Sequence, residues 1–455
     1  MKTKLIFFLP LLLLFINCTD SDTDSSSLKL SESTFKNVDG NGETLRINIE
    51  SNSAWKVSSD QQWCIPFQEK GDNDGELVLS VVANLDGSSR DATVTIMSSK
   101  ASKKIQINQK ALNSTAKEYH YKLPVIFHVF YEDKADALQY VNSNILSEIL
   151  TEVNKLYKDA NKSIDMNLTF TLATIDPEGN EMTTPGVEYI KWPESYPIDC
   201  EKFMEDETKG YVNYLWEPNL YINVMVYNFK RTKSNTIILG ISNLPFSTKG
   251  KNFLKGLVET DNSFLKKSNL KFPYCVSINS IYINDHTMDG NINATVAHEL
   301  GHYLGLHHVF NERNGETVNA CIDSDYCEDT PPYNKFEYDD YARENYGSSF
   351  SILALRVNCN TEEKFTSRNI MDYSYSYLNQ FTSDQFSRVR HVLMYSPLIP
   401  GPKIGQSTSA RAVSDGPLDL PIRRDIRKII KFKATNSLRV SCLFCIFKHS
   451  PQKTV

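Results

Sequence analysis

The sequence predicts an antiparallel β-sandwich followed by an α+β domain, and three observations support this division. Residues 28–112 consist of short runs in which apolar and polar residues alternate. From residue 123 onward strand-like runs are mixed with helical patterns, and an irregular polar segment follows residue 309. A chain of 455 residues is also longer than one hydrophobic core usually serves.

The alternation in residues 28–112 is typical of strands that bury one face. Leu45, Ile47 and Ile49 show it most clearly, and turn sequences separate the runs. Trp55 is expected in the core of this sandwich. The small and polar residues 113–119 are predicted to be a linker.

The second domain is predicted to span residues 120–400. The apolar run 123–130 should be its first strand. A helix should follow, because Ile145, Ile149 and Val153 share one helical face. Further strands are predicted at 168–172, 220–226 and 237–241.

Residues 1–17 are typical of an export signal. An apolar run follows Lys2 and Lys4, and it is shorter than the roughly 20 residues that cross a bilayer. The run ends in a sequence that resembles a bacterial lipobox, which implies acylation of Cys18. Residues 18–27 would then be a lipid-anchored tether of an exported outer-membrane lipoprotein that is exposed at the cell surface. Plain secretion is the alternative.

Composition and charge argue against a nucleic-acid partner. The formal net charge is −6 and 40% of the residues are hydrophobic, values that are ordinary for a globular protein. Basic residues such as Arg424, Arg427 and Lys428 gather in residues 401–455. This part is predicted to be a poorly ordered basic tail.

Residues 298–308 read HELGHYLGLHH. His298 and His302 are four residues apart, so on a helix both imidazoles lie on one face and can reach one metal ion. Gly305 is placed to end the helix in a left-handed turn that brings His308 back toward them. Three neutral imidazoles that leave a fourth position for water are typical of catalytic zinc.

His307 stands beside His308 and is the alternative third ligand. The motif resembles that of the metzincins, and this resemblance implies that His308 is the ligand. His307 is then expected at the rim of the cleft or in the core.

Glu299 follows the first histidine, so its carboxylate should lie beside the metal and not on it. Zinc lowers the pKa of a bound water to about 7, and a carboxylate in this place can act as general base and then as acid toward the leaving amine. The motif therefore predicts an extracellular zinc-dependent endopeptidase. It would hydrolyse peptide bonds of proteins or peptides through a zinc-bound water activated by Glu299.

The zinc motif and the later sequence Asn369-Ile370-Met371-Asp372-Tyr373 resemble the metzincins, and within them the pappalysin family. Leu239-Gly240-Ile241, Asp329-Thr330-Pro331 and Phe381-Thr382 extend the likeness across residues 120–400. The resemblance implies a metzincin-type α+β domain, with a twisted mixed sheet, a zinc helix and an irregular C-terminal subdomain.

The same resemblance implies roles for three further parts of the chain. Met371 would form the floor beneath the zinc ligands. The hydroxyl of Tyr373 would lie near the zinc and hydrogen-bond the tetrahedral intermediate. The strand at 237–241 would be the edge that pairs with an extended substrate.

The segment from Asp325 to Thr330 resembles a calcium loop of the same family. Its side-chain oxygens suit a hard cation, so calcium is a second candidate ion beside zinc. Ser324 and Cys327 depart from the family pattern. A solvated acidic turn is the alternative.

Residues 28–112 resemble the BACON domain, a bacterial immunoglobulin-like module. The likeness rests on Ser53-Ala54-Trp55-Lys56-Val57, on residues 90–96 and on Ile107-Asn108-Gln109. It implies a module that binds glycan or that serves as a spacer. The alternative function of the chain is therefore a surface glycan-binding or adhesin lipoprotein with an inactive protease domain, although the intact Glu299 argues against it.

Three cysteines lie between the zinc motif and Met371. We predict a disulfide from Cys321 to Cys359, because both flank the segment that must fold beneath the zinc helix and an exported chain can oxidise them. Cys327 is the competing partner for either one.

Overall fold

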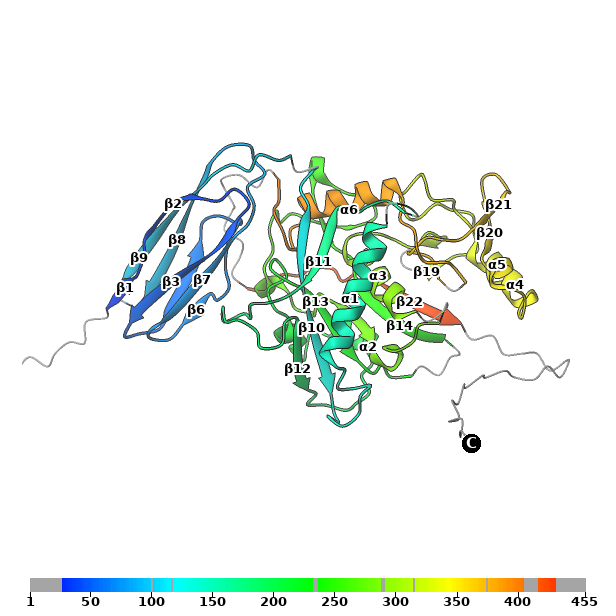
Figure 1. Ribbon diagram of the computed structural model, residues 1–455, viewed down its shortest axis with the longest axis horizontal. Helices are drawn as coiled ribbons and strands as arrows, with labels where there is room; N and C mark the ends of the chain where they lie inside the picture. Colours follow the sequence, from blue (N-terminus) through cyan, green and yellow to red (C-terminus); the bar gives the residue numbers. More distant parts are fainter. Residues whose placement is uncertain are drawn as a thin grey trace, which may run out of the picture. The chain divides into compact units, whose positions relative to one another are not determined.

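The computed structural model describes residues 27–404 and 416–430, apart from residues 100, 116–117, 160, 162, 232–235, 288–290, 314–315 and 374. The predicted signal peptide, Cys18 and residues 431–455 lie outside the described residues. The chain divides near Asn113 into two units, each with its own hydrophobic core (Figure 1). Among the described residues, no helix is long and apolar enough to span a bilayer.

The first unit is a β-sandwich, as predicted. Its sheets have the strand orders β1-β3-β7-β5 and β2-β9-β8-β4-β6, and neighbours pair antiparallel except β2 and β9. Trp55 lies in its core and is 3% exposed. The strands are β1 (Leu28–Leu30), β2 (Thr34–Val38), β3 (Glu43–Ser51), β4 (Trp55–Ser59), β5 (Cys64–Pro66), β6 (Lys70–Gly71), β7 (Gly75–Val81), β8 (Arg90–Ser98) and β9 (Ser102–Gln109).

The second unit is built on a mixed sheet with the order β11-β10-β13-β17-β14-β22, and β12 also pairs with β10. β10, β11, β12, β13 and β17 run parallel, whereas β14 is antiparallel to both β17 and β22. Every residue of β13 is buried, as in a parallel strand that is covered on both faces. The strands are β10 (Tyr121–Tyr131), β11 (Leu168–Leu172), β12 (Val187–Lys191), β13 (Ile222–Tyr227), β14 (Thr236–Asn243), β17 (Val276–Asn279) and β22 (Arg424–Ile430).

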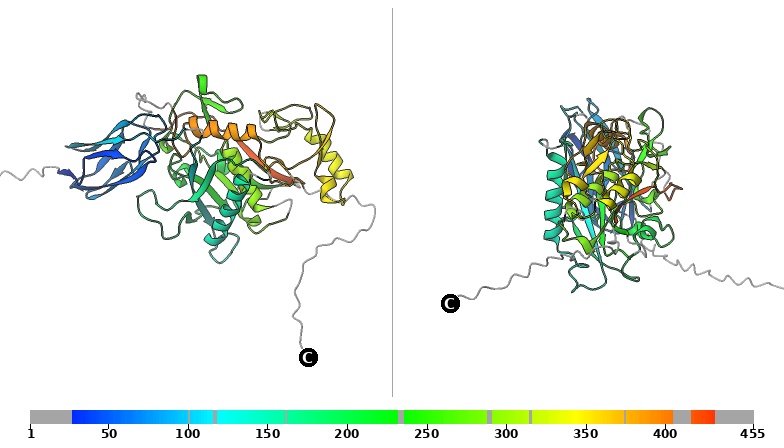
Figure 2. Two further views of the ribbon diagram at one scale, coloured as in Figure 1. Left: turned by 45° about the horizontal axis from the view of Figure 1, so that its top comes forward. Right: turned by 90° about the vertical axis from the view of Figure 1, so that its right-hand side faces the viewer.

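Helices packed on this sheet make the unit an α+β domain, as predicted. Helix α1 lies along one face of the sheet in Figures 1 and 2, and α3 packs against it through a hydrogen bond from the Tyr157 hydroxyl to the Ala297 carbonyl. Side chains of Asn142 and Asn291 cap the two helices by accepting from backbone N–H groups. The α-helices are α1 (Ser143–Lys158), α2 (Cys200–Glu205), α3 (Ile292–Tyr303), α4 (Lys335–Glu344), α5 (Phe350–Leu353) and α6 (Ser383–Tyr395).

The part of the unit around and after α3 contains short strands and long loops. A disulfide joins Cys321 to Cys359 in this part, which is the predicted pairing, and Cys327 is a buried free thiol. The short elements are β15 (Phe246–Thr248), β16 (Val258–Thr260), β18 (Glu312–Arg313), β19 (Glu316–Thr317), β20 (Leu355–Val357), β21 (Lys364–Thr366) and 3₁₀ turns at Tyr211–Tyr214, Gly250–Asn252, Lys267–Asn269 and Ser280–Tyr282.

The prediction of a poorly ordered tail from residue 401 was wrong for residues 416–430. Residues 424–430 form β22, which pairs antiparallel with β14 over its whole length. Asp425 and Arg427 are 3% and 1% exposed. A basic composition normally indicates a solvated segment, but the open edge of β14 offers unpaired backbone groups that this strand satisfies.

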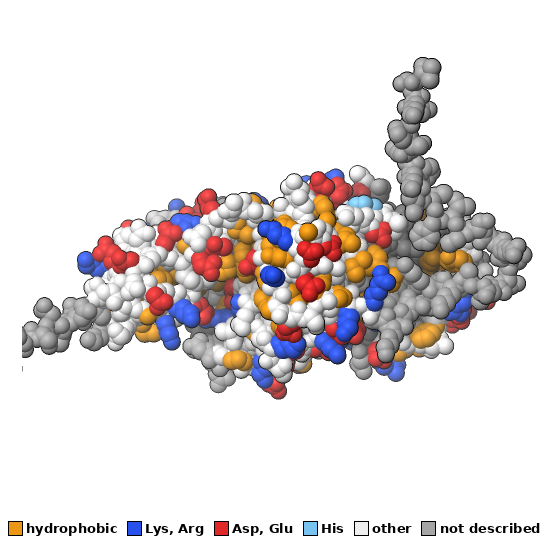
Figure 3. Space-filling view, turned by 90° about the horizontal axis from the view of Figure 1, so that it is seen from below, with side chains coloured by type: hydrophobic (Ala, Val, Ile, Leu, Met, Phe, Trp, Pro, Cys, Tyr) orange, Lys and Arg blue, Asp and Glu red, His pale blue; other side chains and the backbone are white. Residues whose placement is uncertain are grey.

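The surface of the described residues carries charges of both signs. On the face drawn in Figure 3, acidic and basic side chains are interspersed among polar and hydrophobic ones. The two signs are nearly balanced over the whole sequence, with 49 Lys and Arg against 55 Asp and Glu. Surface charge therefore does not indicate a particular partner.

Candidate active site

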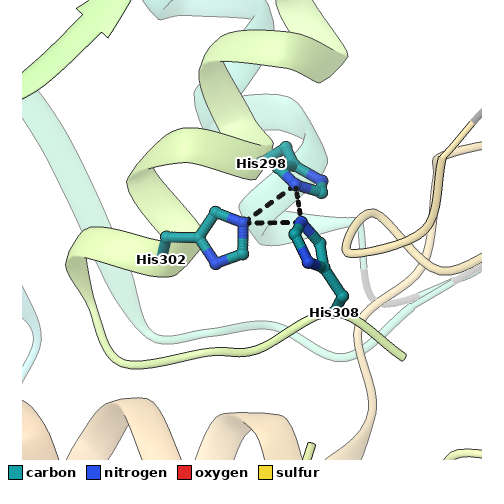
Figure 4. A group of neighbouring side chains, drawn as sticks. All are labelled: His298, His302 and His308. Atoms are coloured by element: carbon teal, nitrogen blue, oxygen red, sulfur yellow. Dashed lines mark hydrogen bonds between the residues drawn. The ribbon is translucent and has the colours of Figure 1, made fainter. Parts of the chain in front are cut away.

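Helix α3 and the turn after it bring three histidines together. His298 and His302 lie one helical turn apart, and His308 comes from the chain beyond the turn (Figure 4). Their Nε2 atoms lie 3.0 Å apart for His302 and His298, 3.1 Å for His302 and His308, and 3.2 Å for His308 and His298. All three side chains are buried.

The other ring nitrogens fix which tautomer each imidazole adopts. Nδ1 of His298 lies 2.7 Å from the Ile370 carbonyl, and Nδ1 of His302 lies 2.8 Å from the Leu306 carbonyl. A carbonyl oxygen can only accept, so each Nδ1 carries the proton and each Nε2 keeps its lone pair. Nδ1 of His308 lies 2.9 Å from the carboxylate of Glu312, so this Nδ1 also carries the proton and Nε2 keeps its lone pair.

The three Nε2 atoms fit a zinc ion. Tetrahedral zinc with bonds of about 2.0–2.1 Å separates ligand nitrogens by about 3.3 Å, close to the distances found here. Lone pairs that face one another in a buried place repel unless a cation lies among them. Burial also lowers the pKa of His302 to about 3 and that of His308 to about 4, which keeps both rings neutral and able to bind a metal.

The turn after α3 has the predicted conformation. Gly305 has φ +92°, in the left-handed region, and a Cβ there would lie 2.7 Å from the Val392 side chain. Arg388 on α6 holds the turn, because its Nε donates to the Gly305 carbonyl at 2.6 Å. The chain can therefore reverse and direct His308 toward the helix.

His307 does not join the three histidines. Its Nδ1 lies 3.7 Å from the carboxylate of Asp425, and its ring contacts Tyr326 edge-on. Its Nε2 makes no hydrogen bond within the described part of the chain. The structure thus gives His307 a buried place behind the site, as the sequence analysis expected.

Glu299 lies beside the histidines against the edge of the sheet. A Cβ at Gly240 on β14 would come within 2.6 Å of both Cγ and Oε1 of Glu299. Burial raises the pKa of Glu299 well above its ordinary value, and the charge of Arg427 acts in the opposite direction. The backbone N–H of Arg427 also lowers this pKa, although neither carboxylate oxygen has a partner at normal hydrogen-bond geometry among the described residues.

The Asn369–Tyr373 segment lies under and beside the histidines. Met371 packs directly on α3, since a Cβ at Gly301 would lie 2.5 Å from its sulfur. Asn369 exchanges two side-chain hydrogen bonds with Gln385 on α6, at 3.0 and 3.1 Å. The Tyr373 ring packs edge-on against His308 with ring centroids 4.7 Å apart.

The predicted calcium loop is closed by its own hydrogen bonds. The Thr330 hydroxyl donates to Asp325 at 2.6 Å, and the Cys327 N–H donates to the same carboxylate at 3.0 Å. The two predicted calcium ligands thus contact each other. Calcium is not supported by this arrangement, and we do not propose it.

Comparisons with known proteins agree with the two-part reading of the chain. Residues 205–394 match the family model of M43 peptidases, described as "Pregnancy-associated plasma protein-A". Residues 53–110 match the BACON model, described as "Putative binding domain, N-terminal".

Residues 205–394 form a peptidase domain of the pappalysin family.

Relatives of known name cover only parts of the chain. An extracellular metalloprotease of Arthroderma otae is 38% identical over 104 residues, which are 23% of this chain and 32% of that protein. One of Arthroderma benhamiae is 36% identical over 104 residues, again 23% and 32%. The chain thus spans about a third of the length of these curated relatives.

Part of the chain is also similar to part of a glycoside hydrolase. The xyloglucan-specific endo-β-1,4-glucanase BoGH5A of Bacteroides ovatus is 32% identical over 101 residues, 22% of this chain and 20% of that protein. A solved structure of a Bacteroides ovatus GH5 xyloglucanase matches 26% of this chain and 25% of that chain, at 22% identity and a TM-score of 0.19.

The structure adds residues to the pappalysin site that the sequence analysis did not assign. Glu312 accepts from His308, and Asp425 forms a second cluster with these two residues in which the ligand atoms lie within 4.8 Å of one another. Asp425, Ile426 and Arg427 reach the site from β22, more than 100 residues after the zinc motif. Distance along the chain hid them, although the β-branched residues Ile426, Ile429 and Ile430 within the basic segment favour a strand.

Proposed function

We propose that this chain is an exported zinc-dependent endopeptidase that cuts proteins or peptides outside the cell. One observation carries the proposal: the Nε2 lone pairs of His298, His302 and His308 converge within 3.2 Å beside the buried carboxylate of Glu299. The pappalysin match and the names of the curated relatives support the same class of reaction.

The three histidines would hold the zinc, and Glu312 would orient His308 through its Nδ1 proton. When bound, zinc supplies Lewis-acid polarisation of the substrate carbonyl and lowers the pKa of a water. Every other contribution comes from side chains and backbone of this chain.

Glu299 would move the proton. Its carboxylate takes a proton from the attacking water and delivers it to the amine nitrogen of the leaving peptide, a role worth roughly 10²–10⁴-fold in rate. Burial favours the protonated form that the second step needs, since it raises the pKa of this carboxyl. A metal cation nearby opposes that effect and favours the ionised form that the first step needs.

Tyr373 would stabilise charge on the substrate carbonyl oxygen. Its hydroxyl donates to a backbone carbonyl, that of Ile426, in the strand that pairs with β14. A substrate in the same place would present its own carbonyl to this donor. Burial raises the pKa of Tyr373 well above its ordinary value, so the hydroxyl keeps its proton for donation.

The edge of β14 would bind substrate through its backbone. Main-chain pairing tolerates many sequences, so an extended segment of a protein or peptide is the fitting substrate class. Gly240 fits this role, because a side chain there would displace Glu299.

We also propose that the enzyme is anchored to the outer membrane through an acylated Cys18 and faces the cell exterior. The apolar run before Cys18 and the names of the extracellular relatives support export. Metabolic labelling with a fatty-acid analogue should mark the wild-type chain and should fail with Cys18→Ser. Label on the variant would refute the anchor.

A surface adhesin with an inactive protease domain is the competing function. The BACON match permits glycan binding by the sandwich. An inactive domain would not need a buried Glu299 beside three converging imidazoles, so the site favours the enzyme.

The test is peptide hydrolysis by the purified, zinc-loaded chain. A mixture of unstructured peptides is digested and the products are read by mass spectrometry. We expect cleavage at internal bonds, loss of activity with a chelator and recovery with added zinc. No cleavage by zinc-loaded chain, both as wild type and after displacement of β22, would refute the proposal.

A further inference from the structure

The strand β22 occupies the edge of β14 at the catalytic residues. It runs antiparallel to β14 with Arg427 opposite Gly240 and Ile426 opposite Ile241. Gly240 is also the residue at which an added Cβ would lie 2.6 Å from the Glu299 side chain. In Figure 1, β22 lies beside β14 although the two are far apart in sequence. The C-terminal segment therefore crosses the site at the level of the general base.

One peptide bond in β22 lies at the two groups that peptide hydrolysis needs, Tyr373 and Glu299. The carbonyl of Ile426 accepts a hydrogen bond from the Tyr373 hydroxyl. The next residue, Arg427, is paired with Gly240, where an added Cβ would lie 2.6 Å from Oε1 of Glu299. A substrate would present its carbonyl oxygen and its leaving nitrogen in this same order.

Side chains on both sides of this bond are buried in the site. Asp425 lies 3.6 Å from Nδ1 of His302 and 3.7 Å from Nδ1 of His307. Arg427 is 1% exposed and is paired with Gly240. Asp425 and Arg427 are thus buried at the site, whereas Ile426 between them is half-buried.

Contacts at the first residue of the strand and just before it hold β22 in register. Arg424 forms an ion pair with Glu205 on α2 at 2.8 Å, and Arg423 donates to the Gly256 carbonyl at 2.8 Å. The backbone N–H of Leu244, just after β14, donates to the Arg423 carbonyl at 2.9 Å. The pairing with β14 is therefore anchored at the N-terminal end of β22.

We propose that β22 is bound as a substrate would be, with the Ile426–Arg427 peptide bond at the reacting position, and that the C-terminal segment thereby inhibits the enzyme until it leaves. This inference rests on the proposed function of the same site. A tethered segment acts at an effective concentration of about mM, so a peptide substrate at lower concentration competes poorly with it. Release of β22 from the cleft is then the event that activates the enzyme.

The test compares two neighbouring variants of the full-length, zinc-loaded chain. Arg427→Ala removes a buried side chain that faces the site, and Lys428→Ala removes the same charge from a residue that is only half-buried. Hydrogen–deuterium exchange of the β14 amides reports whether β22 is in place. Hydrolysis of a fluorogenic peptide reports whether the cleft is open. A synthetic peptide of residues 423–430 is then added to the Arg427→Ala chain.

We expect slow exchange of β14 amides in the wild type and in Lys428→Ala, and faster exchange in Arg427→Ala. Hydrolysis should rise at least tenfold in Arg427→Ala and stay within twofold of the wild type in Lys428→Ala. The added peptide should lower the raised rate again. The inference is overturned if the β14 amides of the wild type already exchange freely, or if their release in Arg427→Ala brings no rise in hydrolysis above the wild type.

Failure of the proposed function would look different from failure of this inference. If no form cleaves any peptide although zinc is bound, the endopeptidase assignment fails, and with it the inhibition. The exchange measurement then still decides whether β22 closes the edge of β14.

Discussion

The position of His308 depends on one glycine and one arginine. The left-handed Gly305 lets the chain reverse, and Arg388 holds the Gly305 carbonyl. His308 then reaches the other two rings, whereas its neighbour His307 faces Asp425 at 3.7 Å. Two adjacent imidazoles thus have different surroundings, and only one of them has its Nε2 directed at the shared centre.

This difference predicts opposite effects of two alanine substitutions on metal content. His308→Ala should lower zinc to well below one ion per chain, because a ligand is lost. His307→Ala should leave zinc near one ion per chain. Metal analysis after dialysis decides between them, and equal loss in both variants would show that the third ligand is misassigned.

Gly240 offers a second test at the scale of one residue. Its φ is not in the left-handed region, so alanine is tolerated by the backbone, but the new Cβ would lie 2.6 Å from the Glu299 side chain. In the Arg427→Ala chain, in which β22 does not inhibit, we expect Gly240→Ala to reduce hydrolysis at least tenfold with zinc retained, because the general base must move. Gly75→Ala is the control, since its Cβ would meet only Trp55 at 3.5 Å. Unchanged hydrolysis in Gly240→Ala would mean that the position of Glu299 is not critical.

The residues of the zinc motif could be predicted from sequence because their geometry is local. Four-residue spacing on a helix and a glycine at its end place His298, His302 and His308 without knowledge of the rest of the fold. Asp425 and Arg427 could not be found in this way. In β22 the charged Asp425 and Arg427 are buried whereas Ile426 between them is only half-buried, which reverses the usual alternation of a strand.

At the scale of elements, the disulfide cross-links the irregular part of the second unit. Cys321 and Cys359 are 38 residues apart in sequence. We expect Cys321→Ser/Cys359→Ser to lose about 2–4 kcal/mol of stability, as is usual for a cross-link of this kind. Non-reducing peptide mapping of the wild type should find the two cysteines linked, and finding both as free thiols would contradict the pairing.

The loop at Asp325 predicts a dependence of stability on pH. Burial raises the pKa of this carboxyl to about 8. The folded chain therefore binds more protons here than the unfolded chain between about pH 4 and pH 8, so stability falls as the pH rises through this range. Asp325→Asn keeps both hydrogen-bond partners and does not ionise.

We therefore expect Asp325→Asn to gain stability relative to the wild type between pH 5 and pH 8, by about 1 kcal/mol or more, or about 2–4 °C in Tm. Glu328→Gln, an exposed acid in the same loop, should show no such trend. Thermal unfolding of each variant and the wild type at pH 5 and pH 8 measures the difference in stability. A rise of Tm with added calcium in the wild type and not in Asp325→Asn would instead support a calcium site.

Strand and helix patterns predicted the sandwich and, in the second unit, β10, α1, β11, β13 and β14, but not β12, β17 or β22. The period-two alternation before residue 112 was sufficient to predict the sandwich. The apolar run 123–130 was sufficient to predict β10, the first strand of the second unit. The antiparallel edge strand β14 was predicted to be free for substrate. Its pairing with β22 depends on a contact between distant parts of the chain, which no local pattern contains.

At the scale of the whole molecule, the chain joins a BACON sandwich to a pappalysin peptidase domain. The two units have separate hydrophobic cores, and the proposed catalytic residues all belong to the second unit. The separate cores do not decide whether the sandwich is a spacer or a binding module. The proposed function of the molecule is therefore hydrolysis of peptide bonds at the site of His298, Glu299, His302 and His308.

The most direct test of this claim is the activity and zinc content of Glu299→Gln. The variant is made in the wild-type chain and in the Arg427→Ala chain, so that inhibition by β22 cannot hide the result. We predict that hydrolysis in the Arg427→Ala background falls by about 10²-fold or more while zinc stays near one ion per chain, because a proton carrier and not a ligand is lost. Hydrolysis that persists within tenfold of the parent, with zinc bound, would contradict the account.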